Sequence, residues 1–554
     1  MAAPSTKGVA AACALLVLAG CQAPPSRVDA AAPSVTTLAD APARCAALLE
    51  TRATGLRVTQ AEWIAAGTQR VIEPHTGEAV GEALPAHCRV RGRLDERVGV
   101  DRERYHIGFE LRLPQAFTGR MLVQGGEGLG GTLPMAVGRN TGAHGWERHA
   151  LGRGFAAAST DEGHQQSSPL FGLDRQARID QAWRAHERTT QVARQLVERF
   201  YGQPPQRSYF VGCGSGGRQG MLFAQRHPEL FDGIVAVAPA MRASLGATIA
   251  AAWTVQSLAA VAPRGADGQR LLAQALNDAQ LQRVGREIVD RCDAADGLVD
   301  GLVSDTALCR IDVQRLTCPD AGEGCLRAEQ AQALRRAMDG PRNRAGTPLY
   351  FRWPWDPGIA HPGWRAWNLG TAAAGAPDAR HVTDTSGALG FVYATPADPT
   401  LTTLGFDFDR DPLRLQATHA LHDSADDVQL RGFVARGGRL LLLHGMADPV
   451  ASAFETVDYQ ERLNRAHGAV AASRFARSFL VPGMNHCAGG PSTDDFDGLA
   501  AIVDWVEGGR APERIVARGS QVRPDITRPL CPYPRIARYR GQGDPAAAES
   551  FDCR

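Results

Sequence analysis

The sequence predicts an α/β fold built around a mostly parallel β-sheet, because short apolar runs alternate with segments of helical periodicity. Each apolar run ends in glycine or another turn residue, which is typical of strands buried on both faces of a parallel sheet. Apolar side chains recur at helical spacing among charged ones in residues 177–201, and again in residues 496–507. The expected strands occupy residues 121–126, 208–213, 233–239, 439–445 and 478–483.

A long middle segment, residues 241–430, does not follow this alternation. It is rich in Gly, Pro, Asp and Trp, and it carries four of the cysteines. We interpret it as an inserted lid domain over one end of the sheet. Residues 45–240 and 431–554 then form the two halves of the core, and 554 residues are enough for both parts.

The N-terminus has the features of an export signal. Residues 9–20 are mostly apolar, but they are too few to cross a bilayer as a helix, which takes ~20 residues. Residues 18–21 (LAGC) resemble the lipidation motif of bacterial lipoproteins, and an ordinary cleaved signal peptide is the alternative. We expect a lipoprotein-type signal peptide over residues 1–21 and a tether over residues 22–44. The protein would be periplasmic or held at the outer membrane by a lipid on Cys21, or otherwise secreted.

The charge composition excludes several classes of function. A formal net charge of +1 gives no field that would attract nucleic acid. The single lysine is Lys7, within the export signal. A phosphate-binding P-loop and a pyridoxal phosphate Schiff base both need a lysine, so both are excluded. The one membrane contact that we expect is the N-terminal lipid anchor.

The cysteines indicate disulfides in an oxidising compartment. The sequence has 12 cysteines, and Cys13 and Cys21 belong to the signal, which leaves 12 − 2 = 10, an even number. The paired C-x-x-C spacing of zinc knuckles is absent from the sequence. We therefore predict five disulfides, whose pairing the spacing alone does not fix. The ten residues are Cys45, Cys88, Cys213, Cys292, Cys309, Cys318, Cys325, Cys487, Cys531 and Cys553.

Three segments supply the side chains of a catalytic triad. Residues 208–220 run from a predicted strand through small residues around Ser215 into a predicted helix, which is the shape of a nucleophile elbow. Asp448 follows the strand at 439–445, and His486 lies on a loop after the next strand. Nucleophile, acid and histidine follow one another in this order in α/β-hydrolases, so we expect an α/β-hydrolase core. Asp448 would orient His486, and His486 would activate Ser215.

A glycine-rich loop at residues 125–131 follows the first of these strands. Backbone N–H groups at Gly126 and Gly128, together with Gly216 beside the elbow, would form an oxyanion hole. A plain tight turn is the alternative reading of this loop.

Further short motifs are spread over nearly all of the chain beyond the signal. They are Thr160-Asp-Glu-Gly-His164, Arg218-Gln-Gly220, Phe231-Asp-Gly233, Ala238-Pro-Ala240, Gly437-Gly-Arg-Leu440, His444-Gly-Met-Ala-Asp448, Pro482-Gly-Met-Asn-His-Cys487 and Arg528-Pro-Leu-Cys-Pro-Tyr-Pro534. With these stretches the sequence resembles the tannase and feruloyl esterase family. The resemblance implies an exported enzyme that hydrolyses small aromatic esters, such as feruloyl or galloyl esters, through an acyl-enzyme.

The same resemblance implies how the cysteines pair. The family joins a cysteine just before the nucleophile to one just after the histidine, here Cys213 and Cys487. Such a bridge would hold the elbow and the histidine loop at a fixed separation. The other implied pairs are Cys45–Cys88, Cys292–Cys309, Cys318–Cys325 and Cys531–Cys553.

Residues 292–302 place three carboxylates on a tightly turning loop. Hard oxygen ligands on such a loop suit calcium, although the spacing is not that of an EF-hand. An acidic surface turn is the alternative. The resemblance implies a structural Ca²⁺ bound by the side chains of Asp293, Asp296 and Asp300 and by the backbone carbonyls of Leu298 and Leu302.

The elbow departs from the family pattern Gly-Cys-Ser-x-Gly-Gly-Arg. Residues 212–218 read Gly-Cys-Gly-Ser-Gly-Gly-Arg, so Gly214 stands at the nucleophile position and Ser215 follows it. In one reading, the flanking glycines let the turn readjust until Ser215 reaches His486. In the other, no nucleophile is in reach, and the protein either activates water or is a calcium-stabilised protein that binds aromatic ligands.

We expect the first reading, a serine esterase that uses Ser215, His486 and Asp448. Four tryptophans of the expected lid would either line an aromatic pocket or form the core of the lid. They are Trp353, Trp355, Trp364 and Trp367.

Overall fold

The computed structural model describes residues 35–73, 77–140, 142, 144–166, 168–306, 308–318, 324–371, 378–520 and 523–554. The expected signal peptide, Cys21 and most of the expected tether lie outside these residues. In the part of the chain that is described, no helix is long and apolar enough to span a membrane.

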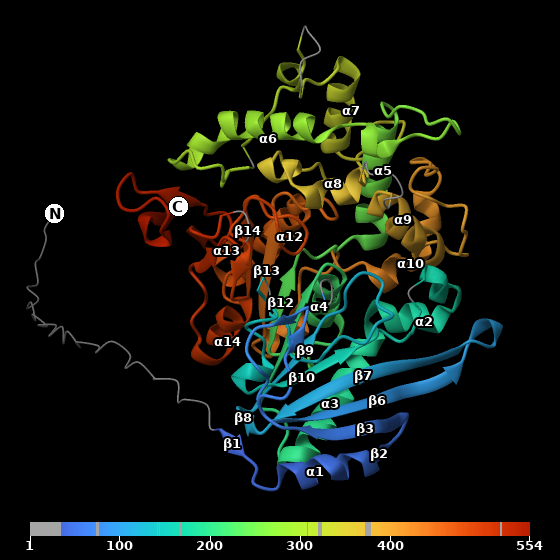
Figure 1. The fold of residues 1–554 in the computed structure, drawn as a ribbon, viewed down its shortest axis with the longest axis vertical. Helices are drawn as coiled ribbons and strands as arrows, with labels where there is room; N and C mark the ends of the chain where they lie inside the picture. Colours follow the sequence, from blue (N-terminus) through green and yellow to red (C-terminus); the bar gives the residue numbers. More distant parts are fainter. Residues whose placement is uncertain are drawn as a thin grey trace, which may run out of the picture. The chain divides into compact units, whose positions relative to one another are not determined.

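Ten of the described strands form one mixed sheet, which confirms the predicted α/β class (Figure 1). Six neighbouring strands are parallel to one another, and the remaining four continue the sheet beyond them, each antiparallel to its neighbour. The five predicted strands are all among the parallel ones. The parallel part runs β14 (Ala476–Val481), β13 (Arg439–Gly445), β12 (Gly233–Val237), β11 (Arg207–Cys213), β9 (Arg120–Gln124) and β10 (Ala156–Thr160). The antiparallel part is β7 (Arg104–Pro114), β6 (His87–Val98), β3 (Leu56–Ile64) and β2 (Arg52–Ala53).

Alternate residues of the central strands pack into different cores, as expected for strands covered on both faces. On β12, Ile234 joins the cluster around Phe210 and Phe223, whereas Val235 joins the cluster around Trp505. The flanking helices are α3 (Ala185–Tyr201), α4 (Ser215–Arg226), α12 (Ala453–His467) and α14 (Gly498–Gly508).

The folded part begins earlier than expected. Strand β1 (Thr36–Thr37) pairs with β8 (Ala116–Phe117), and helix α1 (Ala41–Ala47) starts before residue 45. Leu38 and Ala41 are buried against the core, so the end of the expected tether is part of the fold.

Between β12 and β13 the chain forms a helical region, which Figure 1 shows beyond the ends of these strands. Three of its five tryptophans, Trp353, Trp355 and Trp364, pack in a hydrophobic core of its own. We call this region the lid; its limits at residues 241 and 430 remain a prediction. Its helices are α5 (Thr248–Ala259), α6 (Asp278–Cys292), α7 (Ala328–Asp339), α8 (Pro362–Asn368), α9 (Arg380–Gly387) and α10 (Pro412–His422). Helix α11 (Arg431–Ala435) follows the lid, and its Phe433 packs in the core.

The structure contains five disulfides among the described residues, and they pair the cysteines as the resemblance implies. They are Cys45–Cys88, Cys213–Cys487, Cys292–Cys309, Cys318–Cys325 and Cys531–Cys553.

A buried carboxyl group ties three core segments together. Glu162, just after β10, accepts hydrogen bonds from the side-chain amides of Gln219 on α4 (3.0 Å) and Gln181 (3.2 Å). The Gln219 side-chain oxygen in turn accepts the backbone N–H of Gly126 at 3.0 Å. The network thus fixes the glycine-rich loop against the first turns of α4. Burial raises the pKa of Glu162 to about 8.

We predict that Glu162→Gln flattens the pH dependence of stability. Because the pKa of Glu162 is higher in the folded chain than in the unfolded chain, its stabilising contribution is complete below about pH 4.5 and is lost as the pH rises towards 8. The free energy of unfolding should fall by up to about 1.4 kcal/mol per pH unit from this group, and the glutamine variant should lose that slope. Denaturant titrations at several pH values measure it. Glu127→Gln, a half-exposed carboxylate on the neighbouring loop, is the control. Equal slopes for wild type and Glu162→Gln would contradict the prediction.

Candidate active site

Strand β11 passes into helix α4 through a sharp turn centred on Gly214. Gly214 has φ 59° and ψ −114°, a backbone conformation that glycine adopts readily and other residues adopt only under strain. A Cβ atom on Gly216 would lie 2.7 Å from the carbonyl oxygen of Gly126. The elbow and the glycine-rich loop therefore approach backbone to backbone, which explains the glycines on both sides.

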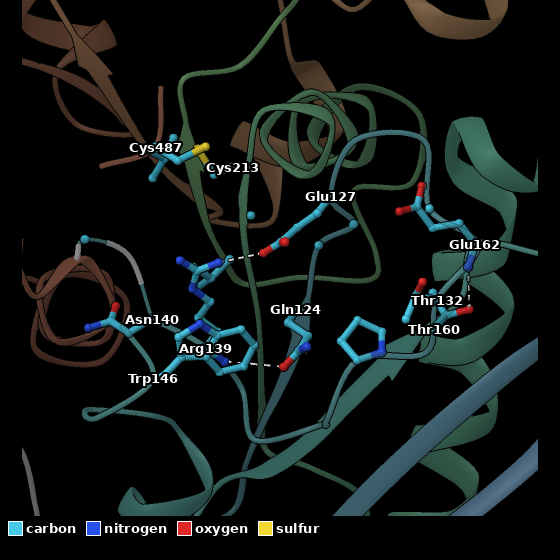
Figure 2. Close-up of a pocket in the computed structure, with 18 residues that line it drawn as sticks. Gln124, Glu127, Thr132, Arg139, Asn140, Trp146, Thr160, Glu162, Cys213 and Cys487 are labelled. Atoms are coloured by element: carbon cyan, nitrogen blue, oxygen red, sulfur yellow. Dashed lines mark hydrogen bonds and ion pairs between the residues drawn. A yellow bond between two sulfur atoms is a disulfide. The ribbon is translucent and has the colours of Figure 1, made fainter. Parts of the chain in front are cut away.

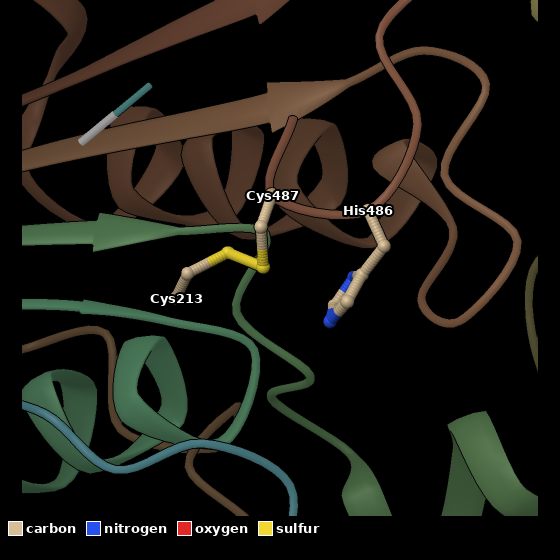
Figure 3. Close-up of side chains that lie close together, drawn as sticks. All are labelled: Cys213, His486 and Cys487. Carbon is tan, nitrogen blue, oxygen red and sulfur yellow. A yellow bond between two sulfur atoms is a disulfide. The ribbon is translucent and has the colours of Figure 1, made fainter. Parts of the chain in front are cut away.

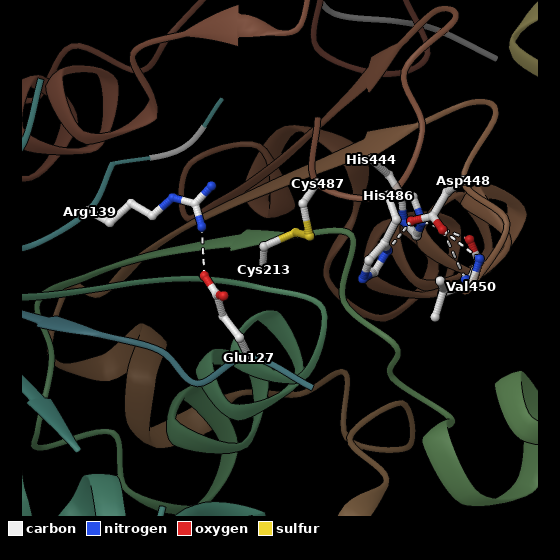
Figure 4. Close-up of a disulfide and its surroundings, with 9 residues drawn as sticks. Glu127, Arg139, Cys213, His444, Asp448, Val450, His486 and Cys487 are labelled. Atoms are coloured by element: carbon white, nitrogen blue, oxygen red, sulfur yellow. Dashed lines mark hydrogen bonds and ion pairs between the residues drawn. A yellow bond between two sulfur atoms is a disulfide. The ribbon is translucent and has the colours of Figure 1, made fainter. Parts of the chain in front are cut away.

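An acid–histidine pair lies opposite this turn. Asp448 follows β13, and its Oδ2 atom is 2.8 Å from Nδ1 of His486, as Figure 4 shows. The backbone N–H groups of Val450 (2.7 Å) and Ala451 (3.2 Å) donate to the other carboxylate oxygen. Burial alone would raise the pKa of Asp448, but His486 and His444 hold that pKa well below its ordinary value. Asp448 is thus an ionised acceptor that orients His486 with Nε2 towards the elbow.

Ser215 and His486 line the same cavity, but the Ser215 hydroxyl does not hydrogen-bond His486 in this structure. A Cβ atom built on Gly214 would lie 2.8 Å from His486 Nε2, so the side-chain position that faces the imidazole belongs to residue 214. Ser215 is the first residue of α4, and its hydroxyl is buried without a hydrogen-bond partner among the described residues. The glycines do not shift the register of the turn.

The N–H groups that are free to form an oxyanion hole differ from the three that we expected. The N–H of Gly126 already donates to Gln219 and is therefore not available to a ligand. Ser215 and Gly216 open helix α4, so their N–H groups have no acceptor within the helix. Gly128 lines the cavity in front of His486 and remains a candidate donor.

The Cys213–Cys487 disulfide holds the two halves of this site together. Its cysteines directly flank Gly214 and His486, and their Cα atoms are 5.9 Å apart (Figure 3). The two sulfur atoms and a His486 nitrogen lie within 4.8 Å of one another. Because the sulfurs are bonded to each other, they cannot serve as thiolate ligands, and this trio is not a metal site while the bridge is intact.

A cavity of about 410 Å³ opens in front of His486, between the core and the lid. Trp367 is the lid tryptophan that lines it, with its ring 6.0 Å from the His486 ring in an edge-to-face arrangement. The guanidinium of Arg380 lies 4.0 Å above the Trp367 ring. Tyr393 and several alanines complete the lid side. The cavity thus presents aromatic and apolar walls to the imidazole.

A second cavity, of about 360 Å³, lies behind the disulfide and is lined by Gln124, Asn140 and Trp146 (Figure 2). In Figure 4 the disulfide separates the Arg139–Glu127 ion pair (2.6 Å) from His486 and Asp448. Both cavities are lined by this ion pair and by the disulfide.

The acidic loop after α6 has oxygen atoms suited to a hard cation. Asp293 Oδ1 is buried without a hydrogen-bond partner among the described residues, whereas Oδ2 accepts the N–H groups of Asp300 and Gly301. Burial, with the nearby charges of Asp300 and Asp296, raises the pKa of Asp293 to about 6. Asp300 is paired with Arg528 in this structure. The unpartnered oxygen and the crowded carboxylates fit a calcium ion.

Several cavity residues were not predicted from the sequence. Tyr393 and Arg380 come from lid segments with weak periodicity. Arg218 belongs to the elbow motif, but nothing in the sequence indicates that its side chain reaches the cavity. The pair of Glu127 and Arg139 joins two loops whose proximity only the fold reveals.

Known proteins resemble the chain over most of its length. The family model for tannase and feruloyl esterase matches residues 88–554. A mono(2-hydroxyethyl) terephthalate hydrolase of Piscinibacter sakaiensis is 41% identical over 530 residues, covering 87% of this chain and 86% of that protein. Feruloyl esterase B of Aspergillus niger is 28% identical over 479 residues, covering 81% of this chain and 84% of that protein. The crystal structure of feruloyl esterase B from Aspergillus oryzae has a TM-score of 0.76 at 25% identity and covers 93% of this chain and 100% of that one. The chain therefore belongs to the tannase and feruloyl esterase family of carboxylic ester hydrolases.

Proposed function

We propose that the protein hydrolyses esters of aromatic acids with a water molecule, rather than a serine, as the nucleophile. The observation that carries the proposal is the His486–Asp448 pair facing the vacant side-chain position at Gly214. Among the described residues, none hydrogen-bonds Nε2 of His486, so this nitrogen is free to accept a proton from water. The relatives named as a terephthalate hydrolase and feruloyl esterases support an aromatic acyl group, as does the wall formed by Trp367.

In this reaction His486 acts as a general base and then as a general acid. Nε2 takes a proton from water as the water oxygen attacks the ester carbonyl carbon. The resulting oxyanion is held by the N–H groups of Ser215 and Gly216 at the start of α4. The imidazolium, stabilised by Asp448, then gives its proton to the departing alkoxide, which leaves the free acid and the alcohol. Ser215 contributes its backbone amide and not its hydroxyl.

We predict that Gly214→Ser raises kcat/KM on aromatic esters by at least ~100-fold, because loss of the nucleophile of a serine hydrolase costs up to about 10⁶-fold. The serine would have to adopt the strained backbone conformation of an elbow, so the variant should also lose about 1–3 kcal/mol of stability. Steady-state kinetics with feruloyl and benzoyl esters, together with thermal denaturation, measure both effects.

Two further variants distinguish a water nucleophile from a Ser215 nucleophile. Ser215→Ala should retain wild-type turnover, whereas His486→Ala should abolish it. Loss of turnover in Ser215→Ala with no gain in Gly214→Ser would instead favour an acyl-enzyme on Ser215. Tight binding of aromatic esters without turnover in the wild type would favour a ligand-binding protein.

We also propose that the loop at residues 292–302 binds a structural calcium ion. The carboxylates of Asp293, Asp296 and Asp300 and the carbonyls of Leu298 and Leu302 would hold the ion, as the family resemblance implies. The unpartnered oxygen of Asp293 supports this proposal. The ion would tie the lid to the C-terminal segment around Arg528, which is paired with Asp300.

We predict that chelation of calcium lowers Tm by a few degrees, because an ion at 100 times its Kd stabilises the folded state by about 2.7 kcal/mol. Asp293→Asn should remove the response to added Ca²⁺. Asp290→Asn, an exposed carboxylate on the adjoining helix, is the control. A Tm that is the same with EDTA and with Ca²⁺ would contradict the proposal.

The five disulfides are typical of an exported protein. We propose that Cys21 carries the lipid anchor, on the basis of the motif at residues 18–21. Mass spectrometry of the mature N-terminus tests this: a lipidated Cys21 supports the anchor, and an unmodified start beyond Cys21 contradicts it.

A further inference from the structure

The Cys213–Cys487 disulfide and His486 bring three metal-ligating side chains to one point (Figure 3). The two sulfur atoms and one His486 nitrogen lie within 4.8 Å of one another. Thiolate sulfur and imidazole nitrogen are donors that zinc prefers, whereas the oxygen donors of residues 292–302 suit calcium. The S–S bond occupies both sulfurs, so the three side chains become a ligand set only when that bond is broken.

His486 is already oriented as a metal ligand. Its Nδ1 atom is 2.8 Å from Oδ2 of Asp448, and Nε2 has no hydrogen-bond partner among the described residues. Histidines that bind zinc hold the other ring N–H against a carboxylate or a carbonyl in the same way, which fixes the ring and its tautomer. A Cβ atom on Gly214 would lie 2.8 Å from Nε2. Glycine at this position therefore leaves open the space beside Nε2 that a side chain would fill.

Space for an ion lies on both sides of the bridge. The cavities of about 410 Å³ and 360 Å³ are each lined by both Cys213 and Cys487. Neither cysteine is fully buried, so a small reductant and a metal ion can reach the sulfurs. A tetrahedral zinc site with Zn–S bonds of ~2.3 Å places two thiolates about 3.8 Å apart. The cavities leave room for that separation and for a water molecule as the fourth ligand.

Both cysteines remain anchored by other contacts when the bridge is open. Cys213 is the last residue of β11 and pairs with Val237 of β12 in the sheet. The loop that carries His486 and Cys487 is held through Asn485, whose side-chain amide donates to the backbone carbonyls of Ala447 (3.0 Å) and Gly358 (3.3 Å). The ligands would therefore stay near one another, and a metal ion could replace the S–S bond as the cross-link.

We infer that reduction of the Cys213–Cys487 bridge creates, together with His486, a binding site for Zn²⁺. A dithiol reductant supplies two electrons and two protons: the S–S bond breaks, two thiols form, and the reductant closes to its own disulfide. Zn²⁺ then displaces the two thiol protons, and the two thiolate charges offset the charge of the ion. The bound ion occupies Nε2 of His486 and so blocks the base of the hydrolytic reaction. Only this last consequence rests on the proposed function.

Metal binding to the purified mature protein tests the site without any need for turnover. The protein is treated with a limiting amount of dithiol, freed of it under anaerobic conditions, and titrated with Zn²⁺ or Co²⁺ in excess Ca²⁺. The wild type should bind one ion that the Cys213→Ser/Cys487→Ser variant, treated alike, does not bind, and the Co²⁺ form should show sulfur-to-metal charge-transfer absorption. Zn²⁺ should also slow alkylation of these two cysteines at least ~10-fold, because a bound thiolate is a poor nucleophile.

Equal metal binding by the two reduced proteins would overturn the inference. A bridge that is reduced only when the chain unfolds, as followed by near-ultraviolet circular dichroism, would overturn it as well.

Further variants assign the ligands. His486→Ala should weaken Zn²⁺ binding roughly 100-fold, which is the share of one ligand in a site of this kind. Gly214→Ser should weaken it about 10-fold, because the new side chain would fill the space beside Nε2. Cys318→Ser/Cys325→Ser is the matched control, since it removes a half-buried disulfide of the lid and should leave the ion in place. Binding that survives His486→Ala but is lost in this control would overturn the assignment.

Ester hydrolysis then separates the metal site from the proposed function. Zn²⁺ should inhibit the reduced protein relative to the reduced, metal-free protein, and a soft-metal chelator that leaves Ca²⁺ bound should restore turnover. The oxidised protein should not respond to the same Zn²⁺ concentration. Zn²⁺ binding in a protein that hydrolyses no ester, or that hydrolyses esters equally well with the ion bound, would refute the proposed role of His486 and leave the metal site standing.

Discussion

The Cys213–Cys487 disulfide is the constraint on which the geometry of the site depends. It joins Cys213, just before Gly214, to Cys487, just after His486, so the two ends of the site cannot move apart. The hydrogen bonds of the sheet place β11, β13 and β14 in one layer, but they do not extend to the loops that follow these strands. The covalent bridge fixes the separation of two of these loops, and Asp448, held by two backbone N–H groups, fixes the rotation of the imidazole.

Because the elbow is held rigidly, glycine at position 214 removes the side chain that would face His486 without changing the backbone of the turn. The bridge on one side and the hydrogen bond from Arg218 N–H to the Gly214 carbonyl on the other keep the elbow in the conformation that presents residue 214 to His486. Ser215 stays at the start of the helix and cannot replace the missing side chain. In the proposed reaction His486 is the base, Asp448 orients it, the N–H groups of the helix start hold the oxyanion, and residue 214 supplies no nucleophile. Ester hydrolysis with water as the nucleophile requires only the base, the acid and the N–H groups.

Much of the fold could be predicted from the sequence, because buried parallel strands are apolar runs that end in turns. The antiparallel strands β6 and β7 were not predicted, since several polar and charged side chains interrupt their apolar ones. The chain order of elbow, acid and histidine located Asp448 and His486. It did not decide between Gly214 and Ser215, because that choice depends on the direction of a single side chain in the turn. Trp367, Arg380 and Tyr393 come together only through the packing of the lid on the core, which no local pattern encodes.

The most direct test of the account is whether an acyl-enzyme forms. Wild-type protein and Gly214→Ser would be mixed with an activated aromatic ester, quenched in acid during turnover, and measured by intact mass and peptide mapping. The account predicts an acyl adduct at position 214 in the Gly214→Ser variant and no adduct in the wild type, although the wild type turns over the ester. An adduct on Ser215 of the wild type would contradict it, because Ser215 would then be the nucleophile.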